Sequence, residues 1–336
     1  MQHFQRALIS LSLLTAFGCS SVADGPEEVP ASQLEARITD VGSGDVVAYQ
    51  GRITTSTANS PFTDTDDPPE GGVAYLPVLV NNNTPAARLK FDTNGDVTLQ
   101  FKGAAPAAPY LVHLNGVQYL RNGVDAQALP LGPGWSKHAA TRTPSAVKMA
   151  NGFVHLMGGL VGSNNASIAS PFTLAVGLRP PSTTYVNITL CNATKGRLWI
   201  RPDGAVNIQA EGNNDAADAR CFTSLDGVSF ATSVVGATGV AYMNGWSGAM
   251  PSGHLRFRND GAVVRFQGSV IGGTSNVVIN LPPAYRPADA VFLPVDRADT
   301  TRGIVAILVS GDVMIIPVAG GGISDATNFD GLSFVR

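Results

Sequence analysis

Three aromatic side chains stand where they could contact a ligand. Trp135 and Trp246 each follow a glycine, and the face of an indole ring stacks well on a sugar ring. Tyr285 lies in a proline-containing stretch beside Arg286. These residue types predict carbohydrate binding. The alternative for a tryptophan near the start of a small domain is a place in the hydrophobic core of that domain.

A short basic stripe is the second candidate for ligand contact. His254, Arg256 and Arg258 occupy every second position, so a β-strand would place them on one face, with Leu255 and Phe257 on the other. Guanidinium groups bind phosphate and carboxylate oxygens. The stripe therefore predicts contact with an anionic polysaccharide or a lipopolysaccharide phosphate. The alternative is a solvated face or an ion pair between neighbouring domains.

The sequence contains no recognisable catalytic motif. Gly-x-Ser-x-Gly, His-Glu-x-x-His and Gly-x-x-x-x-Gly-Lys are all absent. Asp64, Asp66 and Asp67 lie close together, and such carboxylates could hold calcium or serve a glycosidase, with a solvated acidic loop as the alternative. We therefore expect no enzyme, no catalytic residue and no cofactor, and glycan hydrolysis is the third functional hypothesis.

The N-terminus has the pattern of a targeting segment. Arg6 precedes the apolar run 7–17, which is too short to span a bilayer, and small residues stand before Cys19. The pattern resembles a bacterial lipoprotein signal, with Ala16 where that signal usually has leucine. The resemblance implies a signal peptide at 1–18, lipidation of Cys19, and a membrane-anchored lipoprotein of the cell envelope, at the outer membrane or cell surface. The alternative is an ordinary secretory signal.

The overall composition is that of a folded protein without a nucleic-acid partner. The chain has 336 residues, a formal net charge of −3, 14% charged residues and 37 glycines. Nucleic-acid-binding domains usually carry a basic patch, so we expect no such partner. Many glycines with few charges are typical of turns and β-structure. Residues 19–33 are polar and contain prolines, which predicts a tether.

The two remaining cysteines, Cys191 and Cys221, predict a disulfide. Export would place them where disulfides persist. The bond would close a loop of about 30 residues, which the chain-entropy model values at roughly 3–4 kcal/mol. No further cysteine or histidine stands nearby at a spacing suited to a metal site.

Three short landmarks recur in the same order at intervals of roughly 110 residues, which indicates a tandem repeat. The first begins and ends with glycine, the second is a polar turn, and the third is a polar-glycine turn followed by an apolar residue. They lie at 44–51, 152–159 and 261–268; at 94–97, 203–206 and 310–313; and at 115–119, 226–230 and 330–334. The repeat predicts β domains at 34–120, 129–232 and 241–336.

Each domain is predicted to be a β-sandwich or barrel. Residues 255–258 alternate in polarity, Asn259-Asp260-Gly261 supplies a hairpin turn, and 263–270 continues as a strand. Short strands between turn residues recur along the chain, and no stretch shows a sustained helical period. The fold class is therefore all-β, with three tandem repeats of about 100 residues each.

The third domain resembles the C-terminal β domain of phage tail-fibre and baseplate proteins. The residues that carry the resemblance lie at 244–246, 256–258, 264–268, 281–287, 292–295, 311–313 and 332–334. The second domain has Leu178 in place of an aromatic residue, and the first has 62–69 in place of the central motif. The resemblance implies a distal, surface-contacting β module of a kind that is often trimeric in phage fibres.

Two functional hypotheses follow. The first is a lipid-anchored adhesin or receptor-binding module that engages a cell-surface glycan or polymer. The second is a structural component that assembles with copies of itself or with an envelope or phage-tail-like apparatus. Three domains in one chain could also form a covalent pseudo-trimer, and the alternative is separate domains on a string.

Overall fold

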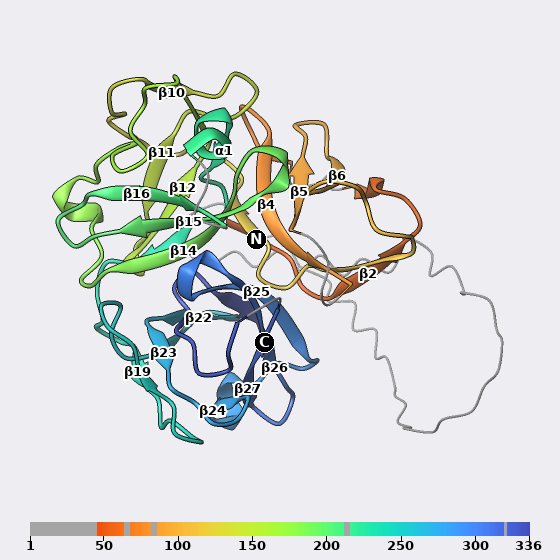
Figure 1. Cartoon of the computed structure of the whole chain (residues 1–336), viewed down its shortest axis with the longest axis vertical. Coiled ribbons are helices and arrows are strands. Elements are labelled where there is room, and N and C mark those ends of the chain that lie inside the picture. Colours follow the sequence, from red (N-terminus) through yellow and green to blue (C-terminus); the bar gives the residue numbers. More distant parts are fainter. Residues whose placement is uncertain (1–45, 64–67, 82–85, 212–215, 319–320) are drawn as a thin grey trace, which may run out of the picture.

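The fold is all-β. The computed structural model describes residues 46–336 except 64–67, 82–85, 212–215 and 319–320. The predicted signal peptide at 1–18, the tether at 19–33, Cys19 and the acidic cluster of Asp64, Asp66 and Asp67 lie outside the described residues. Figure 1 shows three groups of strands, orange, green and blue in chain order, around a common centre. We call residues 46–120, 129–232 and 241–336 the first, second and third segments.

The first segment contains one six-stranded sheet and one short pair of strands. The sheet has the order β2-β7-β4-β5-β6-β3, and β1 pairs with β8. The strands are β1 (Val46–Ala48), β2 (Arg52–Thr55), β3 (Asn59–Thr63), β4 (Ala74–Val80), β5 (Ala87–Phe91), β6 (Asp96–Phe101), β7 (Tyr110–His113) and β8 (Gln118–Leu120).

The second segment contains three sheets, with orders β18-β12-β11-β9, β14-β15-β16 and β10-β13-β17. Its strands are β9 (Gln127–Ala128), β10 (Trp135–Lys137), β11 (Ser145–Lys148), β12 (Phe153–Met157), β13 (Gly159–Gly162), β14 (Thr184–Thr189), β15 (Lys195–Ile200), β16 (Val206–Ala210), β17 (Thr223–Ser224) and β18 (Ser229–Ala231). Its helical turns are η2 (Val176–Leu178), η3 (Cys191–Ala193) and α1 (Ala216–Cys221).

The third segment contains a four-stranded sheet, β19-β21-β22-β29, and a seven-stranded sheet, β20-β23-β28-β25-β26-β27-β24. Its strands are β19 (Thr238–Gly239), β20 (Ser247–Gly248), β21 (Arg256–Asp260), β22 (Val263–Gln267), β23 (Ser269–Ile271), β24 (Val277–Asn280), β25 (Val291–Arg297), β26 (Arg302–Ile307), β27 (Asp312–Pro317), β28 (Thr327–Asn328) and β29 (Ser333–Val335). Its 3-10 turns are η4 (Pro283–Tyr285) and η5 (Ala298–Thr300).

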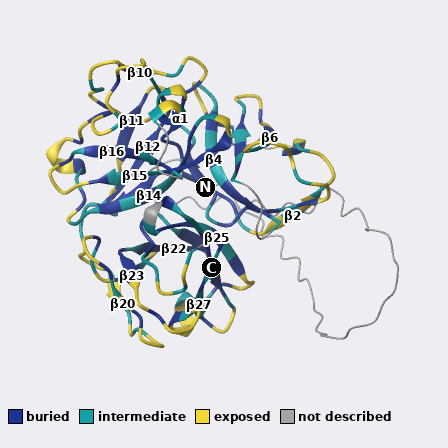
Figure 2. Cartoon of the chain, viewed as in Figure 1, coloured by how far each residue is buried: buried dark blue, intermediate teal, exposed yellow. Residues whose placement is uncertain are grey.

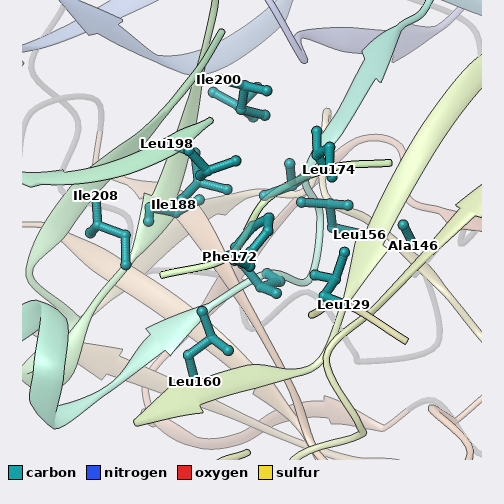
Figure 3. Close-up of a cluster of buried hydrophobic side chains, with 14 of the residues drawn as sticks. Leu129, Ala146, Leu156, Leu160, Phe172, Leu174, Ile188, Leu198, Ile200 and Ile208 are labelled. Carbon is teal, nitrogen blue, oxygen red and sulfur yellow. The ribbon is translucent and has the colours of Figure 1, made fainter. Parts of the chain in front are cut away.

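Each segment has its own hydrophobic core. Three large clusters of buried apolar side chains lie within 47–119, 129–230 and 246–334, and Figure 2 shows that exposed residues lie mainly in the outer loops. In the second segment, Leu156 of β12 and Leu198 of β15 lie on opposite sides of Phe172 (Figure 3). Each such buried side chain contributes about 1.5–3 kcal/mol relative to its exposure to water.

The three segments contact one another where β4, β14 and β25 meet. A glycine from the third landmark of each segment packs against a strand of another segment. A Cβ on Gly116 would lie 2.7 Å from Leu293, one on Gly227 would lie 2.9 Å from Leu76, and one on Gly331 would lie 2.8 Å from Val186. The contacts therefore run from first to third, third to second and second to first segment. The three segments therefore pack against one another in a closed cycle and do not lie apart along the chain.

The predicted disulfide between Cys191 and Cys221 is confirmed. It joins η3 to the last residue of α1, and so ties the end of β14 to the stretch before β17. Within the part of the chain that the structure describes, no helix is long and apolar enough to cross a membrane.

Replacing any of the three contact glycines with alanine should destabilise the protein more than the same change at Gly236. Gly116, Gly227, Gly331 and Gly236 all have φ between +78° and +81°, so alanine adds backbone strain at each. Of the four, only Gly236 has space for a Cβ, which would meet no atom within 4 Å. We expect Gly116→Ala, Gly227→Ala and Gly331→Ala to lower the free energy of unfolding by about 1–3 kcal/mol more than Gly236→Ala, measured in urea. Equal losses in all four variants would contradict the packing argument.

Candidate functional site

Both predicted sugar-stacking tryptophans are core residues. Trp135 is 7% exposed and Trp246 is 4% exposed. Their indole Nε1 atoms donate hydrogen bonds to the Ser167 and Ser275 carbonyl oxygens, at 2.9 and 2.8 Å. An indole that is buried and hydrogen-bonded in this way has no free face for a ligand. The alternative interpretation of these residues is therefore the one that the structure bears out.

Tyr285 lies at the edge of the third core. It ends the 3-10 turn η4 and is partly buried. Its ring meets that of Phe257 edge to face, with centroids 4.7 Å apart. Tyr285 thus packs against a core side chain, and the structure does not bring it together with the basic stripe.

Arg256 and Arg258 of the basic stripe lie on β21, His254 precedes that strand, and the three side chains have two different environments. Leu255 and Phe257 are buried in the core, as the alternation predicts. Arg258 crosses to the second segment, where its guanidinium carbon lies 4.0 Å from the centroid of the Phe153 ring. Burial lowers the pKa of Arg258. His254 and Arg256 instead line a pocket.

This pocket is the candidate functional site, and we call it the junction pocket. It has a volume of about 220 Å³ and lies between the second and third segments. Its wall from the second segment includes Thr184 and Ala231. Its wall from the third segment includes Ser252, Gly253, His254, Arg256, Gln267 and Asp330.

Asp330 is the most buried ionisable group of the junction pocket. It is 7% exposed. Its Oδ1 accepts a hydrogen bond from the Gly268 N–H at 2.7 Å, and its Oδ2 accepts one from the Tyr185 N–H at 3.3 Å. Burial raises the pKa of Asp330 to about 7, although both hydrogen bonds favour the ionised form. The side chain thus links β14 of the second segment to Gly268, between β22 and β23 of the third.

The corresponding aspartate of the second segment has a cation beside it. Asp226 accepts hydrogen bonds from the Gly158 N–H at 3.0 Å and the Tyr75 N–H at 3.4 Å, in the same pattern as Asp330. It also accepts a hydrogen bond from Nη2 of buried Arg142. In the described part of the chain, no arginine or lysine pairs with Asp330.

Strand register explains this difference. Ser145 pairs with Met157, the residue before Gly158, and Arg256 pairs with Gln267, the residue before Gly268. Ser145 and Arg256 therefore occupy corresponding positions. Three residues earlier, the second segment has Arg142 and the third has Gly253. A glycine at this position leaves the carboxylate without a guanidinium partner.

Two further polar atoms in the wall have no hydrogen-bond partner among the described residues. They are Oγ of Ser252, which is 5% exposed, and Oε1 of Gln267. A buried polar atom without a partner costs about 1–3 kcal/mol. A polar ligand in the pocket would offset that cost.

His254 and Arg256 are predicted from the sequence as ligand contacts, whereas Asp330, Gln267 and Ser252 are not. The sequence around Asp330 predicts only a turn, because aspartate before glycine is a common turn pair. The recurrence of a polar side chain at 115, 226 and 330 is the signal in the sequence that could have identified Asp330. No group of three or more histidine, cysteine, aspartate or glutamate residues suited to a metal occurs among the described residues.

Asp330→Asn should reduce the dependence of stability on pH between about 4 and 7. An unfolded aspartate has a pKa near ~3.9, whereas that of Asp330 is about 7, so its stabilising contribution is complete below pH 4 and is lost as the pH rises through 7. Tyr185, His254 and Arg256 are the titratable or charged groups around it. Asparagine should fit in place of Asp330, because the first segment has an asparagine at the corresponding position. There, Oδ1 of Asn115 accepts a hydrogen bond from the Gly51 N–H at 3.1 Å.

The measurement is urea unfolding of wild type and Asp330→Asn at pH 5 and pH 8. Between pH 5 and the pKa of about 7, the wild type should lose up to about 1.4 kcal/mol per pH unit relative to the variant. Parallel stability profiles would show that Asp330 does not hold a proton in the folded state.

Comparisons with known proteins give little further guidance. No protein-family model matches the chain, and no curated protein matches it. Among solved structures, the chain is similar to the receptor binding protein (gp15) of Listeria phage PSA. The match has 21% identity and a TM-score of 0.25, and it covers 29% of this chain and 62% of the phage protein. The chain therefore spans less than two thirds of that protein, and a similarity of this size assigns neither fold nor function.

Proposed function

We propose that this protein is an exported binding protein that engages a cell-surface glycan or another surface polymer through the junction pocket. The observation that carries the proposal is the set of polar groups in one pocket: buried Asp330, Arg256, and the unpartnered atoms of Ser252 and Gln267. A few polar groups that converge in a concave site are typical of ligand recognition.

The position of the pocket supports the proposal. Its walls come from two segments that pack against each other. Arg256 and Gln267 lie on strands, and Ser252 and Asp330 lie in turns. Its volume of about 220 Å³ is below the ~300–1,000 Å³ of drug-sized sites. This size suits one sugar ring or one polymer substituent better than a large ligand.

The sequence resemblance to phage tail-fibre domains is consistent with such a role, because it implies a surface-contacting module. The lipoprotein-like pattern around Cys19 supports a location at the cell envelope. In this proposal the lipid anchor holds the protein at the envelope and the β segments face outward.

A structural role is the second candidate, and a specific observation favours it. Val234, Val235, Met243, Met250 and Ile271 are exposed large apolar residues, and all belong to one stretch of the third segment and the chain before it. Exposed apolar side chains can mark contacts with a partner. Self-association would be the simplest form of such a role.

Arg256→Ser should weaken binding to whole cells and to a glycan array without unfolding the protein. Serine is the residue at the corresponding position of the second segment, Ser145. We expect a loss of about tenfold or more, since an arginine hydrogen bond to an anion is charge-assisted. Arg201→Ser is the control, because Arg201 is exposed on the hairpin between β15 and β16, away from the pocket.

Equal binding by both variants and wild type would exclude the junction pocket as the binding site. An absence of binding by wild type, together with self-association in light scattering, would contradict the binding role and favour the structural role.

Cys19→Ala should abolish lipid attachment. If Cys19 is the acylated residue, radiolabelled palmitate will enter the wild type and not the variant, and the variant will leave the membrane fraction. Equal labelling of the two proteins would exclude lipidation at Cys19.

A further inference from the structure

We propose that the junction pocket binds a zwitterionic substituent of the phosphoethanolamine type, with a primary ammonium against Asp330 and a phosphate against Arg256. This inference rests on the proposed function and names the chemistry of its ligand.

The second segment shows which group this kind of site accepts. Asp226 receives two backbone N–H hydrogen bonds and the Arg142 guanidinium. Asp330 receives the two matching N–H hydrogen bonds, from Gly268 and Tyr185. A buried carboxylate is usually paired with a cation. The internal comparison therefore indicates a cationic group as the natural partner of Asp330.

The place beside Asp330 that would correspond to the Arg142 guanidinium is accessible from the pocket. Gly253 corresponds to Arg142 and lines the pocket, and a side-chain atom added at Gly253 would meet nothing within 4 Å. Asp330 itself also lines the pocket. A small ligand can thus approach the carboxylate from the side that Arg142 occupies in the second segment.

A primary ammonium fits the other polar atoms of this wall. It has three N–H donors and no acceptor. Oε1 of Gln267 and Oγ of Ser252 both have a free acceptor capacity, and neither has a partner among the described residues. Gln267 directly precedes Gly268, whose N–H donates to Asp330. An ammonium beside Asp330 would therefore bring hydrogen-bond donors to a wall that contains these two unpaired acceptors.

The opposite charge is recognised by Arg256. This residue is partly buried on β21, directly across from Gln267. Side chains that pair across antiparallel strands lie on the same face, about 4.5–5.5 Å apart at Cβ. Arg256 forms no ion pair among the described residues, and exposed His254 adds a second potential donor in the same wall. A ligand that carries a phosphate next to an ammonium would therefore contact Arg256 and Asp330 at once.

The test is titration calorimetry of the purified mature protein with O-phosphoethanolamine at pH 8, where Asp330 is ionised. Ethanolamine supplies the ammonium alone, and glycerol phosphate supplies the phosphate alone. The variants are Asp330→Asn, Arg256→Ser and, as a control outside the pocket, Arg201→Ser. Asn115 and Ser145 occupy the corresponding positions in the other segments, so both pocket variants should fold.

We expect phosphoethanolamine to bind wild type and Arg201→Ser equally, and to bind each pocket variant about tenfold more weakly or worse. Each single-charge probe should also bind wild type about tenfold more weakly. Equal affinity for glycerol phosphate, no effect of Asp330→Asn, or no binding of phosphoethanolamine would each overturn the proposal.

Vesicles distinguish the source of the group. Flotation with vesicles containing phosphatidylethanolamine, but not phosphatidylcholine, would identify a lipid headgroup. Binding of the free probe without flotation would identify a polymer substituent.

The two proposals can fail separately. If Arg256→Ser reduces whole-cell binding while phosphoethanolamine does not bind, the binding function stands and the zwitterion is wrong. If wild type does not bind cells but binds the probe, the ligand chemistry stands and the glycan-binding role is wrong.

Discussion

The close approach of three turn glycines to strands of neighbouring segments is the constraint on which the rest of the structure depends. Gly116, Gly227 and Gly331 leave no room for a Cβ against Leu293, Leu76 and Val186. Those three apolar residues are nearly completely buried. Separating the segments would expose them to water, at a cost of about 1.5–3 kcal/mol for each side chain. The cycle of contacts therefore holds the three cores in one arrangement and creates the junctions between them.

The same junction position is filled by different chemistry in each segment. Asn115 exchanges hydrogen bonds with Gly51 and carries no charge. Asp226 is charged and paired with Arg142, and removal of one partner from such a buried pair typically costs about 3–5 kcal/mol. Asp330 keeps the carboxylate without that arginine, and its raised pKa reflects burial. Of the three, the Asp330 junction is therefore the one at which a ligand could replace a missing protein group.

The other contacts between segments differ in the same way. The third and first segments meet through apolar residues that include Leu79 and Ile304. The second and third segments meet through buried charges, where Lys195 and Asp296 form an ion pair. The first and second segments share a hydrogen bond from Arg88 to the Leu190 carbonyl oxygen, at 2.8 Å. A protein made of three identical chains would repeat one chemistry at every junction, whereas one chain can vary each junction independently.

Local patterns were sufficient to predict the all-β class, the hairpins and the two faces of β21, because turn residues and period-two alternation act over a few neighbouring residues. The Cys191–Cys221 disulfide was predictable because these are the two cysteines that remain beside Cys19. The acylation of Cys19 stays a prediction. Packing between distant residues decided the rest. Burial of Trp135 and Trp246 depends on the cores that close around them, and the pocket that joins Arg256 to Asp330 depends on strand pairing and on contact between segments. The proximity of such residues is a property of the folded chain, because linear spacing does not encode which side chains meet across a junction.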